Sequence, residues 1–317
     1  MTYRNEDAKG QSDALVVDLA NPQMPGLSDG APWLKVDLRR DVTGPEARVS
    51  RGAISLIQMG QGVAVAMPTL PAKGVSLQVA MPTLDLDAWQ GLRKVFQPEG
   101  AESRAGDAGN TYVPDTMSIQ ASTVLYQQRT LRDVSATVAH PAEGVWRAQL
   151  ESQQVAGQVE WLPDASPSVQ TASHGAGRIV ARLTRLTIPA AEAQSLEDQA
   201  AEQILSADST GASVPALDIV IDQFNWRGLS LGRLEVEASN RLLPVSAGAA
   251  IPEWRLTKLK LGAPEAQLSA TGAWSAQAPS SVLRRLGLTP RLRPRSSFDF
   301  TLDLQNLGDT LTRLGLP

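Results

Sequence analysis

An internal repeat with an offset of 100 residues is the strongest constraint on what this 317-residue chain can fold into. The segment 117–138 aligns without a gap on 217–238, and both copies share an apolar/polar rhythm. Tyr126 and Trp226 stand at the same place, just before a four-residue polar gap. A repeated strand-rich unit with no catalytic signature predicts an architecture that grows by adding strands. Such a chain is suited to holding or conducting something rather than to transforming it.

Strict alternation of apolar and polar residues marks most of the chain. It starts at Leu34, Val36 and Leu38 and is clearest near the end, at 298–305. Period-2 alternation predicts strands with one apolar and one wet face, which is typical of antiparallel sheet. The run 179–188 changes phase between Leu183 and Leu186, and a β-bulge or a switch of faces would explain this.

Helices are expected to be few and short. An N-cap Asp and helical spacing predict one helix at 87–96, and two others are expected at 281–286 and 307–314. The stretch 190–206 fits either an exposed helix or a disordered insertion. The domain organisation that follows has four parts: an extended or poorly ordered lead-in (1–31), a first β segment with the short helix (32–112), a first β repeat with an insertion at 190–210 (113–212), and a second β repeat with short terminal helices (213–317).

Composition excludes several classes of function. A net charge of −4 does not suit nucleic acid as the main partner, because phosphate neutralisation needs a basic excess. The chain has no cysteine and only two histidines, His140 and His174, so we expect neither a metal site nor a cofactor. We expect no membrane-spanning segment and find no signal peptide at the N-terminus. The chain is then either cytoplasmic or a piece of a longer protein.

A sheet with one apolar face must cover that face, and the expected helices are too few to do so. Three solutions remain open: two sheets packed as a sandwich, a closed barrel, or a long sheet whose apolar face is left open for an apolar ligand. An enzyme, for example a carbohydrate-active β-protein, would gather carboxylates in one cleft. Here Asp85, Asp87, Asp218 and Asp222 are dispersed by the alternation, so we expect no catalytic activity and no catalytic residue.

Several segments, in this order, resemble one protein family. They are Leu84-Asp-Leu-Asp-Ala-Trp89, the run 182–189, the run 215–236, Trp254-Arg-Leu-Thr-Lys-Leu, the run 266–274 and the closing 311–317. Together they resemble the later half of the YhdP family of AsmA-like proteins from Gram-negative bacteria, over roughly residues 45–317. Each motif is a soft strand pattern, so the resemblance lies in their order and spacing.

The resemblance implies a long β-sheet folded into a trough in the periplasm, as part of a protein anchored in the inner membrane. Its apolar groove would carry phospholipid acyl chains toward the outer membrane, with the remaining segments of the longer envelope protein as partners. The sequence lacks the family's N-terminal anchor, its first half and its extreme C-terminus, so we expect a fragment. The alternative is a self-packed β scaffold or interaction module in cell-envelope assembly.

The candidate groove consists of the apolar residues that alternate with polar ones along each strand. The same residues could equally form an ordinary hydrophobic core, and the sequence pattern alone does not distinguish a groove from a core. The candidate residues are Val75, Leu77, Val79, Ile119, Ala121, Trp146, Ala148, Leu150, Ile219, Ile221, Leu268, Ala270, Phe298, Phe300 and Leu302.

Overall fold

The structure is a computed structural model that describes residues 2–5, 12–20, 32–43, 48–58, 70–88, 114–127, 129–163, 177–190, 192–194, 214–245, 249–263, 265–275, 295–306 and 308. The chain divides into two compact units, residues 1–153 and 154–317. Within the described ranges, no helix has the length and apolar character needed to span a membrane.

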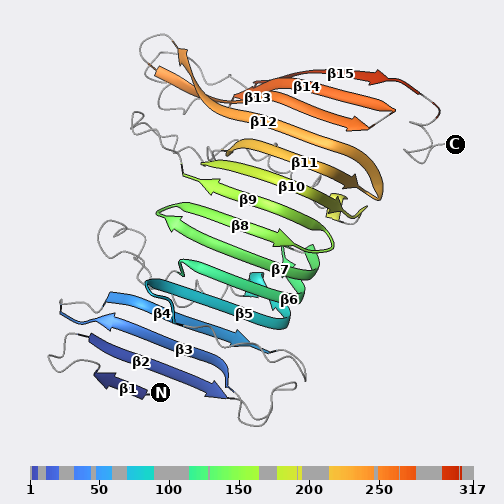
Figure 1. Ribbon diagram of the computed structural model, residues 1–317. Helices are drawn as coiled ribbons and strands as arrows, with labels where there is room; N and C mark the ends of the chain where they lie inside the picture. Colours follow the sequence, from blue (N-terminus) through green and yellow to red (C-terminus); the bar gives the residue numbers. More distant parts are fainter. Residues whose placement is uncertain are drawn as a thin grey trace. The chain divides into compact units, whose positions relative to one another are not determined.

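In the first unit, eight strands hydrogen-bond in the order in which they occur along the chain (Figure 1). They are β1 (Thr2–Asn5), β2 (Ser12–Ala20), β3 (Pro32–Asp41), β4 (Arg48–Ile57), β5 (Gly74–Asp85), β6 (Thr116–Tyr126), β7 (Arg129–Ala142) and β8 (Val145–Glu151). The pairs β4–β5 and β5–β6 are parallel, and the other neighbours are antiparallel. The strands β1 and β2 fall within the stretch 1–31, where the sequence indicated only an extended lead-in.

In the second unit, seven strands also hydrogen-bond in the order in which they occur along the chain. They are β9 (Val155–Leu162), β10 (Arg178–Ile188), β11 (Ala216–Trp226), β12 (Leu229–Val245), β13 (Ala249–Ala263), β14 (Ala266–Ser275) and β15 (Arg295–Leu304). Only β10–β11 is parallel. The register of β9 on β10 shifts between Leu183 and Arg185, which confirms the irregularity predicted from the phase change.

The predicted mainly β chain, built as one sheet layer from successive strands, is confirmed. Its description as antiparallel needs a correction, because three strand pairs are parallel. Alternation along a strand reports which face is apolar but not the direction of the neighbour. The connections β5–β6 and β10–β11 span 86–115 and 189–215, long enough for the crossover that a parallel pair requires.

The sequence repeat is also a structural repeat. The first strands of the two copies, β6 and β11, have bounds 100 residues apart. The hairpin β6–β7 pairs Met117 with Val138 and Tyr126 with Arg129, and β11–β12 pairs Leu217 with Ala238 and Trp226 with Leu229. Gln127 and Arg227 occupy the first turn position with φ of 48° and 53°. Both copies therefore form the same two-residue turn in the same register.

A short helical segment follows the parallel partner strand in both copies, at 86–88 after β5 and at 190 and 192–194 after β10. In the first copy, the amide of Gln127 donates to Asp87 Oδ2 (2.7 Å). In the second, the amide of Arg227 donates to the carbonyl of Ile188 (2.9 Å), and its Nη2 donates to Gln194 Oε1 (3.0 Å). The start of each crossover is thereby tied to the hairpin turn that comes next. The rest of the helix expected at 87–96, the helix at 281–286 and most of 307–314 lie outside the described residues.

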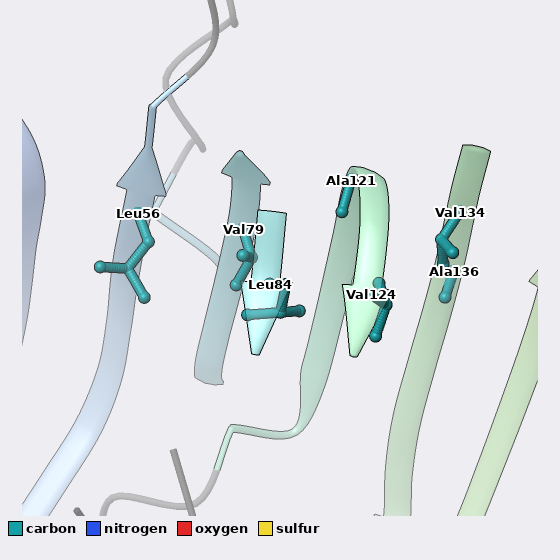
Figure 2. Packing of buried hydrophobic residues seen from close by; sticks show 7 residues of the cluster. All are labelled: Leu56, Val79, Leu84, Ala121, Val124, Val134 and Ala136. Carbon is teal, nitrogen blue, oxygen red and sulfur yellow. The ribbon is translucent and has the colours of Figure 1, made fainter. Parts of the chain in front are cut away.

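Each unit is a single layer as far as its described residues go. Extensive contacts join only strands that are neighbours in the sheet order. The largest buried cluster lies on adjacent strands β4 to β7, and Figure 2 shows its side chains in a row from Leu56 to Ala136. Among the described strands of either unit, sheet-on-sheet packing, the sandwich alternative, is not observed.

Candidate functional site

Continuous apolar rows run across the sheet of the first unit. Residues directly opposite each other in a ladder point to the same face, so the register identifies these rows. One row is Leu19, Leu34, Leu56, Val79, Ile119, Ala136 and Leu150. The next is Val17, Val36, Ile54, Leu77, Met117, Val138 and Ala148. Every member of both rows is apolar, so one face is apolar from β2 to β8.

The second unit has three such rows. The first is Gly157, Leu183, Ile221, Leu234, Leu261, Leu268 and Leu302; the second is Val159, Ala181, Ile219, Val236, Leu259, Ala270 and Phe300; the third is Trp161, Ile179, Leu217, Ala238, Leu256, Gly272 and Phe298. In the antiparallel pairs and in the parallel pair, the apolar residues of one strand lie opposite apolar residues of the next. The seven strands β9 to β15 therefore share one apolar face.

The apolar face of the second unit becomes more exposed toward β15. Ile221 is 2% exposed and Leu183 7%, whereas Phe298, Phe300 and Leu302 are 47%, 75% and 58% exposed. Exposed large apolar side chains that lie together usually mark a surface that something covers. The described chain provides no cover for these three.

The opposite face carries rows that are polar, although not all of their members are exposed: Ser55 in the first unit is 2% exposed. In the first unit the residues Asp18, Lys35, Ser55, Gln78, Ser118, Thr137 and Gln149 form one row. In the second, Glu235 accepts from Lys258 Nζ (2.6 Å) and from Arg233 Nε (2.9 Å). The hydrogen bond from Lys258, and then that from Arg233, lowers the pKa of the Glu235 carboxyl to about 2. This face carries an ion-pair ladder suited to water.

Aromatic residues border the apolar rows at the strand ends. Trp254 and Trp274 are directly opposed on β13 and β14, next to the row that ends in Phe298. The indole Nε1 of Trp254 donates to the carbonyl of Pro215 (3.1 Å). In the first unit, the ring of Trp146 packs against His140 with centroids 4.4 Å apart. The contact gives His140 a packing role, whereas His174 lies outside the described residues.

One polar feature of the apolar face was missed from the sequence. Asp13 lies on β2 with the same parity as Leu15 and Val17, and it is 1% exposed. Arg40, directly opposite on β3, donates to it from Nε and Nη2, both at 2.8 Å. The alternating run from Asp13 to Leu19 was the signal, but it sits inside a stretch rich in Gly, Pro and Asp.

The structure brings the candidate groove residues together within each unit. Leu77 and Ala148 share one row, and Val79, Ile119 and Leu150 share another. Val75 is opposite Gly52, Ala121 is opposite Met81 and Val134, and Trp146 alternates in phase with Ala148 along β8. In the second unit, the rows given above contain Ile219, Ile221, Leu268, Ala270, Phe298, Phe300 and Leu302. The function of this face as a lipid groove stays a prediction, as does the trough.

The candidate set left out residues on the strands between those residues. Ala136, Leu234, Val236, Leu259 and Leu261 complete the rows, and Val134 lies opposite Ala121; their own alternation was the signal that could have found them. An open depression of about 290 Å³ is lined by 76–78, 116–118 and Thr137. Five of these seven residues, Ser76, Gln78, Thr116, Ser118 and Thr137, belong to the polar face, so the depression is not part of the apolar rows. No cluster of three or more His, Asp or Glu side chains that could hold a metal ion occurs in the described part of the chain.

Comparisons with known proteins agree with the resemblance seen in the sequence. Searches of curated proteins and of solved structures found no match. The family model described as YhdP protein matches residues 6–317, which is nearly the whole chain. The chain therefore belongs to the YhdP family.

Proposed function

We propose that the apolar face formed by these rows binds the acyl chains of phospholipids. The observation that carries the proposal is the continuity of the three rows in the second unit, which run unbroken from β9 to the exposed Phe298, Phe300 and Leu302 of β15. A single-layer sheet with one wholly apolar face offers an acyl chain a surface that excludes water along its length.

The driving force is the removal of apolar surface from water. Burial of each CH₂ group contributes about 0.8 kcal/mol, so a dozen methylene groups would contribute roughly 10 kcal/mol before the entropic costs of binding. Apart from the indole N–H of Trp161, the side chains of the three rows carry no polar group, so the face would bind acyl chains without fixing their position along it. Binding of this kind favours sliding, and it needs no catalytic residue and no cofactor.

Family membership supports a wider role as a segment of an AsmA-like envelope protein. In that role the chain would conduct phospholipid between the inner and outer membranes, in the periplasm, with the remaining segments of a longer protein as partners. A self-packed scaffold in envelope assembly is the competing function. It requires the apolar face to be covered by protein, and no second layer covers it in the described residues of either unit.

The test is lipid binding by a matched pair of variants. Phe300→Asp places a charge on the apolar face, and Thr301→Asp places the same charge on the next residue, which is also exposed and points to the opposite face. We would purify both with the parent chain, record native mass spectra, and identify lipids extracted from each. A fluorescent phospholipid offered to each protein gives the affinity.

Phospholipid at constant stoichiometry in the parent chain and in Thr301→Asp, with a loss of at least tenfold in affinity for Phe300→Asp, is the expected result. Circular dichroism checks that both variants remain folded. A parent chain that purifies without lipid and takes up none would overturn the proposal. Equal binding by the two variants would exclude the face at β15 as the contact surface.

A further inference from the structure

The two ends of the strands in the second unit border the apolar face with different residues. At the end where β11 finishes, a fourth apolar row lies beside the three rows already described. We call it the apolar margin, and it consists of Val155, Leu186, Phe224, Ala263, Ala266 and Leu304. At the end where β11 starts, the next row on the same face is the tryptophan margin, which consists of Asn240, Trp254, Trp274 and Ser296.

The tryptophan margin has the composition of a boundary between an apolar and a wet region. Trp254 and Trp274 are half-buried, whereas Asn240 and Ser296 at the two sides of the row are exposed. An indole ring combines a large apolar surface with one N–H donor, and tryptophan is therefore enriched where hydrocarbon meets polar headgroups. Trp254 meets both requirements, because its position adjoins the apolar rows and its Nε1 donates to the carbonyl of Pro215.

Charge distinguishes the two margins in the same sense. The positions directly next to the tryptophan margin along the strands hold three arginines and one glutamate: Arg241, Arg255, Arg295 and Glu253. The positions directly next to the apolar margin hold one arginine and two carboxylates: Arg185, Glu265 and Asp303. The electrostatic potential at the tryptophan margin therefore favours an anion such as a phosphate group, and the potential at the apolar margin does not.

The first unit has the same asymmetry, built from other residues. At the end where β6 starts, Trp146 on β8 packs against His140 on β7. The ion pair between Asp13 and Arg40 borders the apolar face at the same end, on β2 and β3. At the other end of these strands, Leu84 is buried in the largest apolar cluster. Each unit thus has a polar and aromatic border at one strand end and an apolar border at the other.

The distance between the margins suits one acyl chain. On β14, a rise of about 3.3 Å per residue places the rows of Gly272 and Ala266 roughly 20 Å apart. The hydrocarbon layer of one membrane leaflet is about 15 Å thick, half of the bilayer core of about 30 Å. An acyl chain that starts beside Trp274 and follows the strand direction would therefore remain on apolar rows to its end.

We propose that phospholipid lies on this face with its acyl chains along the strands, its phosphate headgroup at the tryptophan margin and its chain ends toward the apolar margin. This orientation rests on the proposed function and adds to it the placement of the bound lipid. A chain lying across the strands would have apolar rows on both sides and no polar border for its headgroup. The margin fixes the lipid along the strand direction and leaves movement from strand to strand open.

The test measures which end of the lipid lies at which margin. The chain has no cysteine, so Ser296→Cys and Leu304→Cys each provide one site for a fluorophore. Both residues are exposed and lie on the apolar face of β15, one at each margin. The proteins are loaded from vesicles of phosphatidylcholine that carries a quenching nitroxide either on the headgroup or near the end of one acyl chain. The vesicles are then removed by sedimentation before the fluorescence is recorded.

We expect the headgroup nitroxide to quench the fluorophore at Ser296→Cys at least threefold more than the fluorophore at Leu304→Cys. The chain-end nitroxide should show the reverse preference. Equal quenching of the two sites by each lipid, or the opposite preference, would overturn the orientation while leaving lipid binding intact. An absence of quenching at both sites by both lipids would overturn the proposed function together with the orientation.

The tryptophan margin itself is tested by Trp274→Leu in the protein labelled at Ser296→Cys. Leucine keeps an apolar side chain but lacks the indole, so the preference for the headgroup nitroxide should fall at least twofold while the affinity for lipid stays within twofold. Trp226→Leu, at the other end of the strands, is the matched control and should leave the preference unchanged. Equal effects of the two substitutions would overturn the assignment of the headgroup to the tryptophan margin.

Discussion

The ring of Phe298 on β15 lies over Gly272 on β14, where it occupies the space that a side chain at position 272 would need. The two residues are directly opposed in the register, and they end the apolar row that begins at Trp161. Gly52 and Leu38 have the same relationship in the first unit. In both places a large apolar side chain covers a glycine on the neighbouring strand, so the row stays apolar without a side chain there.

The first prediction is that Gly272→Val loosens β15. The valine side chain would collide with the ring of Phe298 and with the carbonyl of Ser297, and overpacking of this kind costs about 1–3 kcal/mol. Amide hydrogen exchange should become faster in 295–304 while β11 and β12 stay protected.

Gly262→Ala is the matched control on the adjacent strand. A Cβ at Gly262 would meet only Gln267 Nε2, at 3.9 Å, which is an ordinary contact. Exchange in β15 should be unchanged in this variant. If the two variants behaved alike, the close approach of Phe298 to Gly272 would have no energetic consequence.

The second prediction concerns the buried ion pair of the first unit. Asp13→Ala would remove the carboxylate that accepts two hydrogen bonds from Arg40. Arg40 itself is 20% exposed, so we expect the free energy of unfolding to fall by about 1.5–3 kcal/mol, the usual contribution of a hydrogen bond to a charged group. Urea denaturation followed by intrinsic fluorescence should show this decrease in the free energy of unfolding of the first unit.

Asp222→Asn is the comparison for that loss. Its partner Arg233 and Asp222 itself are 54% and 53% exposed, and exposed pairs contribute about 1 kcal/mol or less. A loss of similar size for Asp13→Ala and Asp222→Asn would show that the Asp13–Arg40 pair is not shielded from water.

The sequence was sufficient to predict the strands and the repeat because both follow from side-chain periodicity. Leu217 to Trp226 and Met117 to Tyr126 align in sequence, and their hairpins have the same register. The direction of β10 against β11 was not predictable, since an alternating strand presents the same face to a parallel or an antiparallel neighbour. The Asp13–Arg40 pair was not predictable either, because two charges 27 residues apart become partners only through the β2–β3 register.

The third prediction is a pH dependence from Glu235. Its pKa of about 2 in the folded chain is below the ordinary value of 4.5, so the folded state favours the ionised form. The contribution to stability is fully present above pH 4.5 and is lost as the pH falls toward 2. The carboxyl is solvent-accessible, so salt should weaken the effect.

Nuclear magnetic resonance of the Glu235 side chain should give a midpoint near pH 2. The unfolding free energy of the variant Glu235→Gln should fall less between pH 4.5 and pH 2 than that of the parent chain. Added salt should change the stability of this variant less than it changes the stability of the parent chain. A midpoint near 4.5 would mean that the bonds from Lys258 and Arg233 do not persist in solution.

The last prediction addresses the turn that both repeats share. Gly228 has a φ of 81°, and a Cβ added there would have nothing within 4 Å, so Gly228→Ala is opposed only by backbone conformation and should cost roughly 1 kcal/mol. Gln127, at a φ of 48°, already bears this strain, and Gln127→Asn should relieve part of it because Asn tolerates the left-handed region better. Thermal unfolding should therefore shift downward for Gly228→Ala and slightly upward for Gln127→Asn. Shifts of the same sign would show that the two turns do not share the left-handed conformation on which the repeat depends.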